Sequence, residues 1–442
     1  MGRTSFQFLA AVFFVCLLLT ACQLSSDTET AATQKQEESA QAAGTSSDIS
    51  LALTVYGQDN GSIPLLISAV KEHFPETDIT WTKGTSDADL NGDICISTIP
   101  AFFDSCAADA LLDLSACGFL DNYYLSDLNN CQIDGRIYYL PGPSETIGIV
   151  YNKDLFREHG WLLPKDLDTF LELCREIRAA GYQPLMPDFH NTSGARLFFT
   201  GFTYDPLLAG IENYTWFQKY TQGEGTITEY GETAVQTMKR LLDEGIWTPE
   251  DFERSVSDLN RAMYQECTCA MTTGSQASLL EAEQAGASLH LGLFPFYSSS
   301  DNNSDYLFSS PAYYVAASRD LTLPGNEARL AKVLEILEFI STPHGQLDII
   351  SQDYPLVSPV RDAIIFNGPF LDTAAATIRK GHLVPMPLFG SMPEGTGDKA
   401  VYQALQLFGE GAIDEGTVLE VIDEGVKSEG EDEKAEGGRG ID

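Results

Sequence analysis

The stretch DGRIYYLPGPSETIGIVYNKDLF, residues 134–156, decides how the chain is organised. Two short apolar runs, 137–140 and 147–151, have the composition of β-strands and flank the tripeptide Pro-Gly-Pro and one acidic side chain, Glu145. Proline fixes φ, whereas glycine permits backbone conformations that other residues avoid. From these residues alone, Pro141, Gly142 and Pro143 form a rigid loop that ends a strand, and the role of Glu145 beside it is open.

Strand and helix patterns alternate on both sides of this stretch. Leu51, Leu53 and Val55 alternate as in a strand, and a helical face follows at Ile63, Leu66, Ile67, Val70 and Phe74. Further helical stripes are predicted over 164–180, with Pro164 in the first turn and Gly181 just after the end, over 235–242, and over 330–340. This rhythm predicts an α/β fold with a mostly parallel sheet covered by helices.

Length and charge narrow the class of protein. With 442 residues, 43% of them hydrophobic, the chain is too long for one ordinary core and long enough for two lobes. The formal net charge of -38 repels phosphate backbones and anionic lipid headgroups, so nucleic acid is excluded as a partner.

The N-terminal residues have the pattern of a targeting segment. Residues 1–21 combine Arg3 with an apolar run too short to span a bilayer, and Leu19-Thr20-Ala21-Cys22 resembles the bacterial lipobox, in which Cys22 becomes lipidated. The alternative is an ordinary signal peptide that contains a cysteine. Residues 22–48 are expected to be the lipidated cysteine and a disordered linker, and 426–442 an acidic disordered tail.

The cysteines and histidines do not predict a metal site. Without Cys16 and Cys22, an odd number of the nine cysteines remains, so full disulfide pairing is impossible. We interpret the rest as small buried apolar residues, with one or two bridges left open. The six histidines show no ligand spacing, and we expect neither a metal nor a cofactor.

Residues 134–185 resemble the crossover region of the family 1 extracellular solute-binding proteins of ABC importers. The matching positions are Asp134, Gly135, Arg136, Tyr138, Pro141 and the run Tyr151 to Phe156. Three further stretches, 92–115, 261–276 and 336–346, resemble the family in the same order, and the similarity covers roughly 50–425.

The resemblance implies a periplasmic-binding-protein-like fold, in which two α/β lobes enclose a ligand cleft and are joined by several hinge crossings. Pro141, Gly142 and Pro143 would be one crossing. The expected lobe 1 is 49–142 plus 291–318, and the expected lobe 2 is 143–290 plus 319–425.

The resemblance also implies ligand contacts on both sides of the cleft. Glu145 matches a position that hydrogen-bonds the ligand in sugar-binding members, although it could instead cap a backbone amide or pair with an arginine. Phe199 could instead pack in the core, and Arg196 could instead pair with an acid. Gln276 replaces the family's stacking tryptophan, which weakens the case for an oligosaccharide. The expected ligand-binding residues are Tyr56, Gln58, Asp59, Ser144, Glu145, Arg196, Phe199 and Gln276.

The function implied is that of a lipid-anchored, extracytoplasmic receptor, expected to be a monomer. It would capture a mono- or oligosaccharide by lobe closure and deliver it to ABC permease subunits. Peptides, polyamines and acidic sugars stay open as ligands. The alternatives are a secreted lipoprotein glycoside hydrolase using two carboxylates and a ligand-sensing protein that feeds a signalling partner. Common catalytic motifs are absent from the sequence, so we expect no enzyme.

Overall fold

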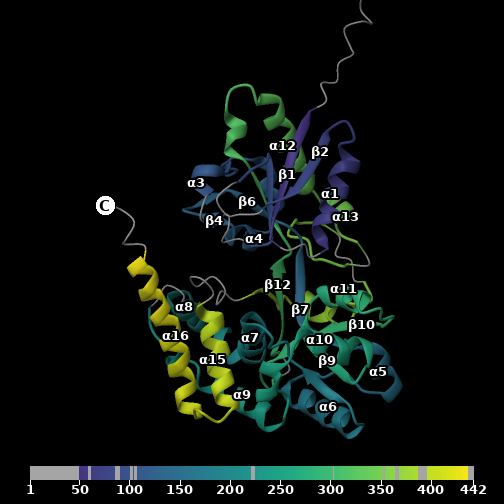
Figure 1. Ribbon diagram of the computed structural model, residues 1–442, viewed down its shortest axis with the longest axis vertical. Helices are drawn as coiled ribbons and strands as arrows, with labels where there is room; N and C mark the ends of the chain where they lie inside the picture. The colour runs from purple at the N-terminus through teal and green to yellow at the C-terminus, as the bar shows by residue number, and fades with distance from the viewer. Residues whose placement is uncertain are drawn as a thin grey trace, which may run out of the picture. The chain divides into compact units, whose positions relative to one another are not determined.

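The computed structural model describes residues 49–436 except 58–60, 85–89, 100–102, 104–106, 221–223, 302, 352–353, 364–367 and 387–395. The predicted signal peptide, Cys22, the linker, Gln58 and Asp59 lie outside the described residues. Two larger sheets, each with its own hydrophobic core, define two lobes (Figure 1).

Lobe 1 is built on a five-stranded sheet in the order β2-β1-β3-β13-β6. Its first three strands are mutually parallel, as predicted, and β13 runs antiparallel to both of its neighbours. The strands are β1 (Ser50–Tyr56), β2 (Asp78–Lys83), β3 (Ile94–Ser97), β6 (Tyr139–Pro141) and β13 (Tyr314–Ala317), with a separate pair β4 (Gln132–Ile133) and β5 (Arg136–Ile137).

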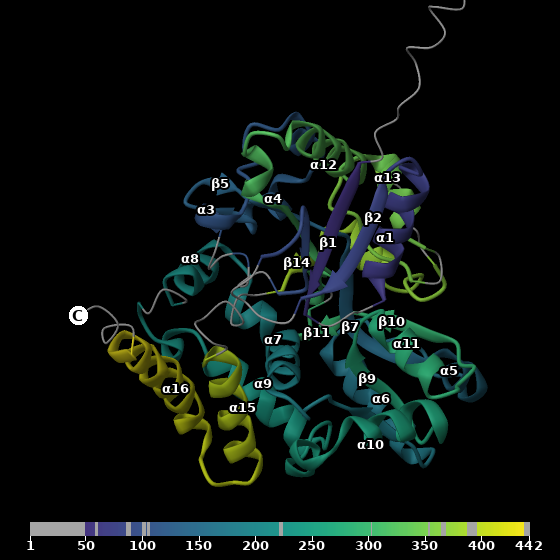
Figure 2. The same ribbon diagram turned by 45° about the horizontal axis from the view of Figure 1, so that its top comes forward.

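The helices of lobe 1 bury the apolar faces that the sequence predicts. In α1 (Ser62–His73) the predicted stripe is buried, and this helix lies beside α13 (Pro343–Ile349) (Figure 2). The predicted stripe at 330–340 lies in α12 (Glu327–Ile340), which ends before Pro343. The remaining short helices are α3 (Ala107–Ala110), η1 (Gly118–Asn122), α4 (Leu125–Asn129) and η5 (Arg319–Thr322).

Lobe 2 is built on a seven-stranded sheet in the order β11-β12-β7-β9-β8, with β10 paired to β7 and β14 to β12. Only the β8–β9 and β12–β14 pairs are parallel, so the prediction of a mostly parallel sheet is wrong here. The reason is that β7 enters the lobe from a crossing and β12 leaves it towards another. The strands are β7 (Ser144–Asn152), β8 (Gln183–Met186), β9 (Cys269–Gly274), β10 (Leu291–Phe294), β11 (Phe296–Tyr297), β12 (Asp305–Pro311) and β14 (Leu383–Pro385).

The helices of lobe 2 cover this sheet. They are α5 (Lys153–His159), α6 (Leu167–Ala179), α7 (Thr192–Leu208), α8 (Ile211–Tyr220), η2 (Ile227–Glu229), α9 (Glu232–Asp243), η3 (Pro249–Glu253), α10 (Val256–Asn260), the π-helical turn η4 (Arg261–Gln265), α11 (Ala277–Gln284), α14 (Ala375–Arg379), α15 (Thr396–Gly409) and α16 (Glu415–Glu436).

Local signals fix the ends of two predicted helices. Helix α6 begins at Leu167, after Pro164, because the Asp166 side chain accepts a hydrogen bond from the Thr169 amide at 2.8 Å and caps the helix. Gly181 follows the helix with a φ of 93°, as expected for the residue after a C-cap. The stripe at 235–242 lies in α9.

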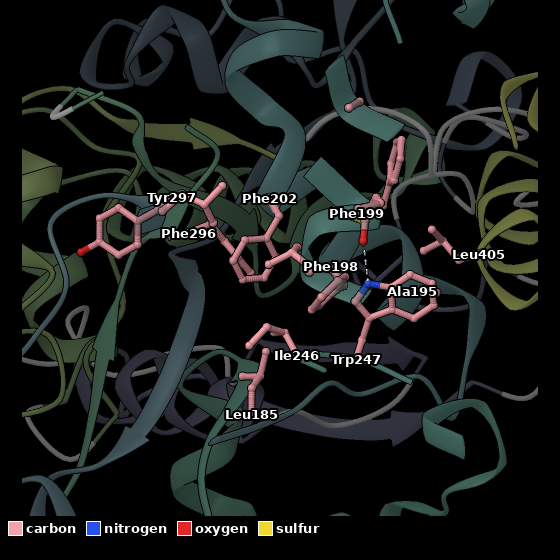
Figure 3. Close-up of a cluster of buried hydrophobic side chains, with 14 of the residues drawn as sticks. Leu185, Ala195, Phe198, Phe199, Phe202, Ile246, Trp247, Phe296, Tyr297 and Leu405 are labelled. Atoms are coloured by element: carbon pink, nitrogen blue, oxygen red, sulfur yellow. Dashed lines mark hydrogen bonds between the residues drawn. The ribbon is translucent and has the colours of Figure 1, made fainter. Parts of the chain in front are cut away.

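An aromatic cluster on α7 forms the centre of the lobe 2 core (Figure 3). Phe198, Phe199 and Phe202 are fully buried, and Trp247 packs beside them while its indole Nε1 donates to the Met238 carbonyl oxygen at 3.2 Å. Burying each large side chain stabilises the fold by roughly 1.5–3 kcal/mol. Helices α15 and α16 complete this core.

The predicted lobe boundaries after residue 290 are wrong. Strands β10, β11 and β12 pair within the lobe 2 sheet, so of 291–318 only the part from β13 belongs to lobe 1. Helices α12 and α13, predicted in lobe 2, pack in the lobe 1 core. An apolar run predicts an element but does not say which sheet receives it. The tail predicted to be disordered from residue 426 continues as helix α16 to Glu436.

Over the described residues, the chain passes between the lobes at three places. It leaves β6 for β7 at Pro141, Gly142 and Pro143, as predicted, leaves β12 for β13 at 311–314, and passes again between Val360 and Phe370. The Gly142 amide donates to the Tyr313 carbonyl oxygen at 2.8 Å, joining the first two crossings. A Cβ on Gly142 would lie 2.4 Å from the Tyr313 ring, so glycine is needed for this close approach.

Candidate functional site

Glu145 is the second residue of β7 and lies immediately after the first crossing. Its Oε2 accepts a hydrogen bond from the Ser275 hydroxyl at 2.6 Å, and its Oε1 accepts from the Tyr354 hydroxyl. Ser275 follows β9 in lobe 2, whereas Tyr354 belongs to the core of lobe 1. This half-buried carboxylate is therefore held by neutral hydroxyls from both lobes, and its partners are neither an arginine nor a backbone amide.

A polar pocket of about 180 Å³ lies at the ends of β8 and β9. Ser275 lines this pocket and also contacts Glu145, so the two features are continuous. Strand β8 is parallel to β9, so the two strands end at the same edge of the sheet. Strand β7 is antiparallel to β9 and therefore begins at that edge, which brings side chains distant in sequence together. The polar lining residues are Asp188, His190, Asn260, Thr272, Thr273, Ser275, Ser278 and Glu281.

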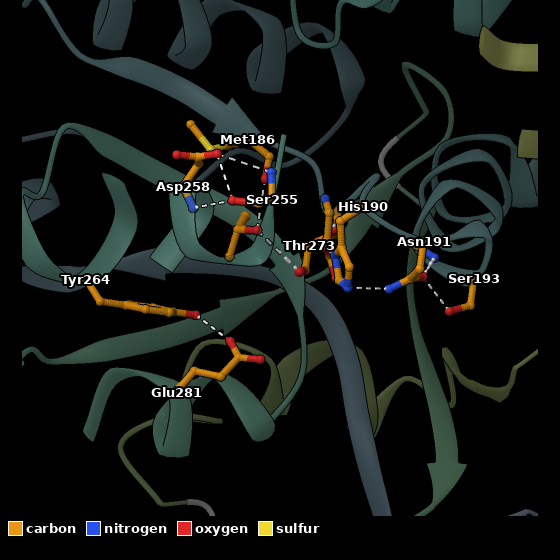
Figure 4. A network of polar contacts seen from close by, with 12 residues as sticks. Met186, His190, Asn191, Ser193, Ser255, Asp258, Tyr264, Thr273 and Glu281 are labelled. Atoms are coloured by element: carbon orange, nitrogen blue, oxygen red, sulfur yellow. Dashed lines mark hydrogen bonds and ion pairs between the residues drawn. The ribbon is translucent and has the colours of Figure 1, made fainter. Parts of the chain in front are cut away.

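His190 lies beside Asn191 at the start of α7 (Figure 4). The His190 Nδ1 contacts the Asp188 carboxylate, and its Nε2 lies 2.8 Å from the side-chain nitrogen of Asn191. This arrangement fits an imidazole that donates through Nδ1 and accepts at Nε2. Asn191 in turn caps α7 by accepting from the Gly194 amide at 2.8 Å. A Cβ on Gly194 would lie 1.6 Å from the Asp188 carbonyl oxygen, so only glycine allows this packing.

Glu281 contributes a second carboxylate, from helix α11. It accepts a hydrogen bond from the Tyr264 hydroxyl at 3.1 Å (Figure 4). Burial raises the pKa of Glu281, and the nearby Asp188 and Glu145 carboxylates raise it further, while Tyr264 and His190 act in the opposite direction. Glu281, Asp188 and Glu145 are therefore close enough to share one electrostatic environment, which is acidic.

A second pocket, of about 320 Å³, is lined from both lobes. Lobe 1 contributes Asn129 and Asn130 at the end of α4, and lobe 2 contributes the rings of Tyr204 and Phe217. The Tyr204 ring is tilted against the Tyr306 ring, with an interplanar angle of 46° and centroids 4.4 Å apart. Side-chain amides and aromatic rings in one pocket are suited to the hydroxyls and the apolar face of a sugar ring.

The lining of the first pocket favours neutral polar groups over anions. Among the described residues that line it there is neither lysine nor arginine, and His190 already faces Asp188. In the described part of the chain, groups of three or more His, Cys, Asp or Glu side chains placed to hold a metal ion are not found. Carboxylates and hydroxyls can instead accept from and donate to a polyhydroxyl solute.

Three of the predicted ligand residues, Tyr56, Ser144 and Glu145, use polar atoms in hydrogen bonds within the protein. Tyr56 is buried at the end of β1, and its hydroxyl accepts from the Asn91 amide at 3.1 Å. Ser144 is buried and pairs through its backbone with Val357. Glu145 adjoins the polar pocket, as described above. Ligand binding by these residues stays a prediction.

Arg196 is occupied by an ion pair. Its Nε lies 2.6 Å from the Asp398 Oδ1, and both side chains are only 12% exposed. Burial raises the pKa of Asp398, and Arg196 counteracts this shift. Arg196 thus pairs with an acid, which is the alternative that the sequence left open.

The structure corrects two predicted ligand contacts. Phe199 is fully buried in the core of lobe 2, on the side of α7 near Leu405 of α15 (Figure 3). Gln276 is also fully buried, and both atoms of its amide group bond to backbone groups. Neither side chain exposes surface to a solute in this structure.

Sequence reasoning missed most of the pocket. Asp188 and His190 directly follow strand β8, and polar residues after a strand end are a usable signal. Ser275 and Ser278 lie on either side of Gln276, which was the only residue of this segment predicted to bind the ligand. Nothing in the sequence pattern pointed to Tyr354, which reaches Glu145 from 209 residues away.

Comparison with known proteins identifies relatives of this architecture. The family model described as bacterial extracellular solute-binding protein matches residues 107–347, more than half of the chain. Among curated proteins, none matches.

Solved structures agree in fold at low sequence identity. A family 1 extracellular solute-binding protein from Bifidobacterium longum subsp. infantis is 16% identical, with a TM-score of 0.65 over 86% of this chain and 98% of that one. RafE in complex with raffinose is 13% identical, with a TM-score of 0.60 over 84% and 97%; its apo form is from Streptococcus pneumoniae. A sugar transporter protein from Bacillus licheniformis in complex with stachyose is 16% identical, with a TM-score of 0.58 over 84% and 98%.

Proposed function

The chain belongs to the bacterial extracellular solute-binding proteins, and from this premise we propose that it captures a neutral mono- or oligosaccharide for an ABC importer. An open form would admit the sugar, both lobes would contact it, and the contacts that bridge the lobes would stabilise the closed form. The released sugar would pass to permease subunits in the membrane.

The observation that carries this proposal is the environment of Glu145. Its carboxylate accepts hydrogen bonds from one hydroxyl of each lobe, from Ser275 and Tyr354. Sugar hydroxyls are donors of the same kind, so they can replace these partners without leaving a charge unpaired. Removing one buried hydrogen-bond partner without such a replacement would be costly.

The charge of the site supports a neutral sugar over an acidic one. Asp188 and Glu281 line the pocket, and Glu145 adjoins it. The arginine that the sequence offered for a ligand carboxylate, Arg196, pairs with Asp398 instead. A uronic acid would therefore bring a negative charge beside carboxylates. Two of the structural neighbours hold raffinose and stachyose, which are neutral.

We also propose that Cys22 carries the lipid that anchors the protein outside the cytoplasmic membrane. Family membership supports the extracellular location. Over the part of the chain that the structure describes, no helix has the length and apolar character needed to cross a bilayer. Replacing Cys22 with serine tests the anchor: we expect the protein to move from the membrane fraction to the soluble fraction, and unchanged membrane association would contradict the proposal.

A thermal-shift screen tests the ligand class. The panel consists of raffinose, stachyose, galactose, galacturonate and spermidine, each at millimolar concentration. A ligand at 100 times its dissociation constant stabilises the folded protein by about 2.7 kcal/mol. We expect one of the neutral sugars to raise the melting temperature by a few degrees and galacturonate to have no effect. A shift with spermidine or galacturonate alone would contradict the proposal.

A further inference from the structure

Gln276 is a fully buried side chain that bonds to two segments far apart in sequence. Its Oε1 accepts from the Thr146 amide at 2.7 Å, and its Nε2 donates to the Pro355 carbonyl oxygen at 2.6 Å. Thr146 lies in β7 of lobe 2, directly beyond the first crossing, whereas Pro355 adjoins Tyr354 and Leu356 in the lobe 1 core. One amide group therefore joins the two lobes beside the hinge.

The bonds around Gln276 form a compact group. Two residues from Thr146, the Ser144 amide donates to the Val357 carbonyl oxygen at 2.7 Å, and the Val357 amide donates back at 2.9 Å. Tyr354 donates its hydroxyl to Glu145 in the same region. The segment 354–357 of lobe 1 is thus held against the start of β7 by backbone bonds at one end, by a hydroxyl at the other and by Gln276 between them.

A glutamine at this position has a physical reason. A buried amide is tolerated only when its donor and acceptor are used, and here each is used by a backbone group. An apolar side chain would remove both of these hydrogen bonds. The bond to Thr146 lies within lobe 2, whereas the bond to Pro355 joins the two lobes, so its loss would act on the hinge.

We propose that Gln276 is a positioning residue for binding: it fixes segment 354–357 of lobe 1 on β7, and thereby keeps the Tyr354 hydroxyl on Glu145 and restricts the hinge. This role concerns how the lobes are coupled and holds whichever solute is bound. Gln276 would therefore act on the coupling of the lobes and not by contact with the solute.

Gln346 provides a matched control. It is 2% exposed, its Nε2 donates to the Ile340 carbonyl oxygen at 2.6 Å, and its Oε1 accepts from the Ser358 hydroxyl at 2.8 Å. Both partners belong to lobe 1, so Gln346 is buried like Gln276 and also makes two side-chain hydrogen bonds, but does not join the lobes.

Hydrogen–deuterium exchange of the full-length chain in detergent, without solute, tests the proposal. Gln276→Met should speed exchange at the Ser144 and Val357 amides about tenfold or more, although neither amide bonds to Gln276, because opening of the segment becomes easier. Gln346→Met should leave the exchange rates of these two amides within about twofold of wild type, although it should lower the melting temperature about as much as Gln276→Met does. Unchanged protection at Ser144 and Val357 in Gln276→Met would overturn the proposal.

A second variant decides the matter if Gln276→Met does not fold. Tyr354→Phe removes the hydroxyl bond to Glu145 and leaves Gln276 in place. Because Gln276 still holds the segment, exchange at Val357 should stay within about twofold of wild type. A tenfold rise would show that Tyr354 alone holds the segment, which would overturn the role assigned to Gln276.

Discussion

Two charged side chains near the sequence-predicted site, Arg196 and Glu145, differ in what neutralises them. Arg196 faces a buried carboxylate, Asp398, so each charge is compensated by an opposite charge. Among the described residues, Glu145 is hydrogen-bonded by neutral hydroxyls, from Ser275 and Tyr354. An ion pair resists exchange of its partners because separation leaves a buried charge, whereas hydroxyls can be replaced by those of a sugar. The first arrangement serves stability, and the second suits binding.

The largest expected effect tests the stability side of this comparison. Arg196→Met leaves Asp398 buried without its partner and should lower the free energy of unfolding by about 3–5 kcal/mol, measured by urea denaturation. The double variant Arg196→Met, Asp398→Leu removes both charges and should recover most of that loss. If Arg196→Met instead weakened sugar binding at unchanged stability, Arg196 would belong to the binding site.

Glu145→Gln tests the binding side. The amide keeps the shape but loses the charge, so affinity for the sugar that gives the largest thermal shift should fall about 10- to 100-fold in calorimetric titration. The free energy of unfolding should change by less than about 1 kcal/mol, since one of the two hydroxyls can donate to the amide oxygen and the other can accept from the amide nitrogen. Asp113→Asn, at a surface carboxylate paired with Arg136 in lobe 1, is the control and should bind normally. Equal affinity of Glu145→Gln and wild type would reject the ligand role.

Ser275→Ala should have a smaller effect of the same sign. The serine hydroxyl orients Glu145 through one hydrogen bond, and one such bond contributes about 0.5–1.5 kcal/mol. We therefore expect affinity to fall roughly 2- to 10-fold in the same titration. A loss greater than that of Glu145→Gln would indicate that Ser275, and not the carboxylate, is the main contact.

The smallest effect is a pH dependence that distinguishes two buried carboxylates. Burial raises the pKa of Glu281 above 4.5, so its contribution to stability falls as pH rises from that value to the pKa of the folded protein. Glu281→Gln should therefore become more stable relative to wild type, by a few degrees in melting temperature, between pH 4 and pH 7.

Asp305 provides the opposite case. Burial alone would raise its pKa, but Thr377, Lys380 and His382 outweigh that effect and lower the pKa below 3.8. Its stabilising contribution is present above 3.8 and is lost as pH falls through the lower pKa. Asp305→Asn should thus lose stability relative to wild type as pH rises from 3 to 5. The same pH trend for Glu281→Gln and Asp305→Asn would contradict the assigned shifts.

The sequence predicts local elements and the first crossing well, because these depend on nearby residues. The apolar stripes of α1, α9 and α12 follow from spacing and residue type, whereas the Pro141-Gly142-Pro143 crossing was implied by the family resemblance. It fails where the partner is distant. Which sheet receives β10 or β12 is decided by pairing with β7, and that pairing leaves no periodic signal in the strands themselves.

The site shows the same division. Glu145 was found because it adjoins a recognisable crossing. The partners of Arg196 and Gln276 were not predicted, since Asp398 and Pro355 are far along the chain and bring no motif with them. An aromatic run such as the one around Phe199 suits a cleft and a core equally well until its neighbours are known.

A crystal structure of the protein grown with the sugar that gives the largest thermal shift tests the central claim most directly. The account predicts sugar hydroxyls within about 2.5–3.2 Å of the Glu145 carboxylate oxygens, with one or both of the Ser275 and Tyr354 hydroxyls displaced. A sugar bound elsewhere, with both hydroxyls still on Glu145, would contradict it.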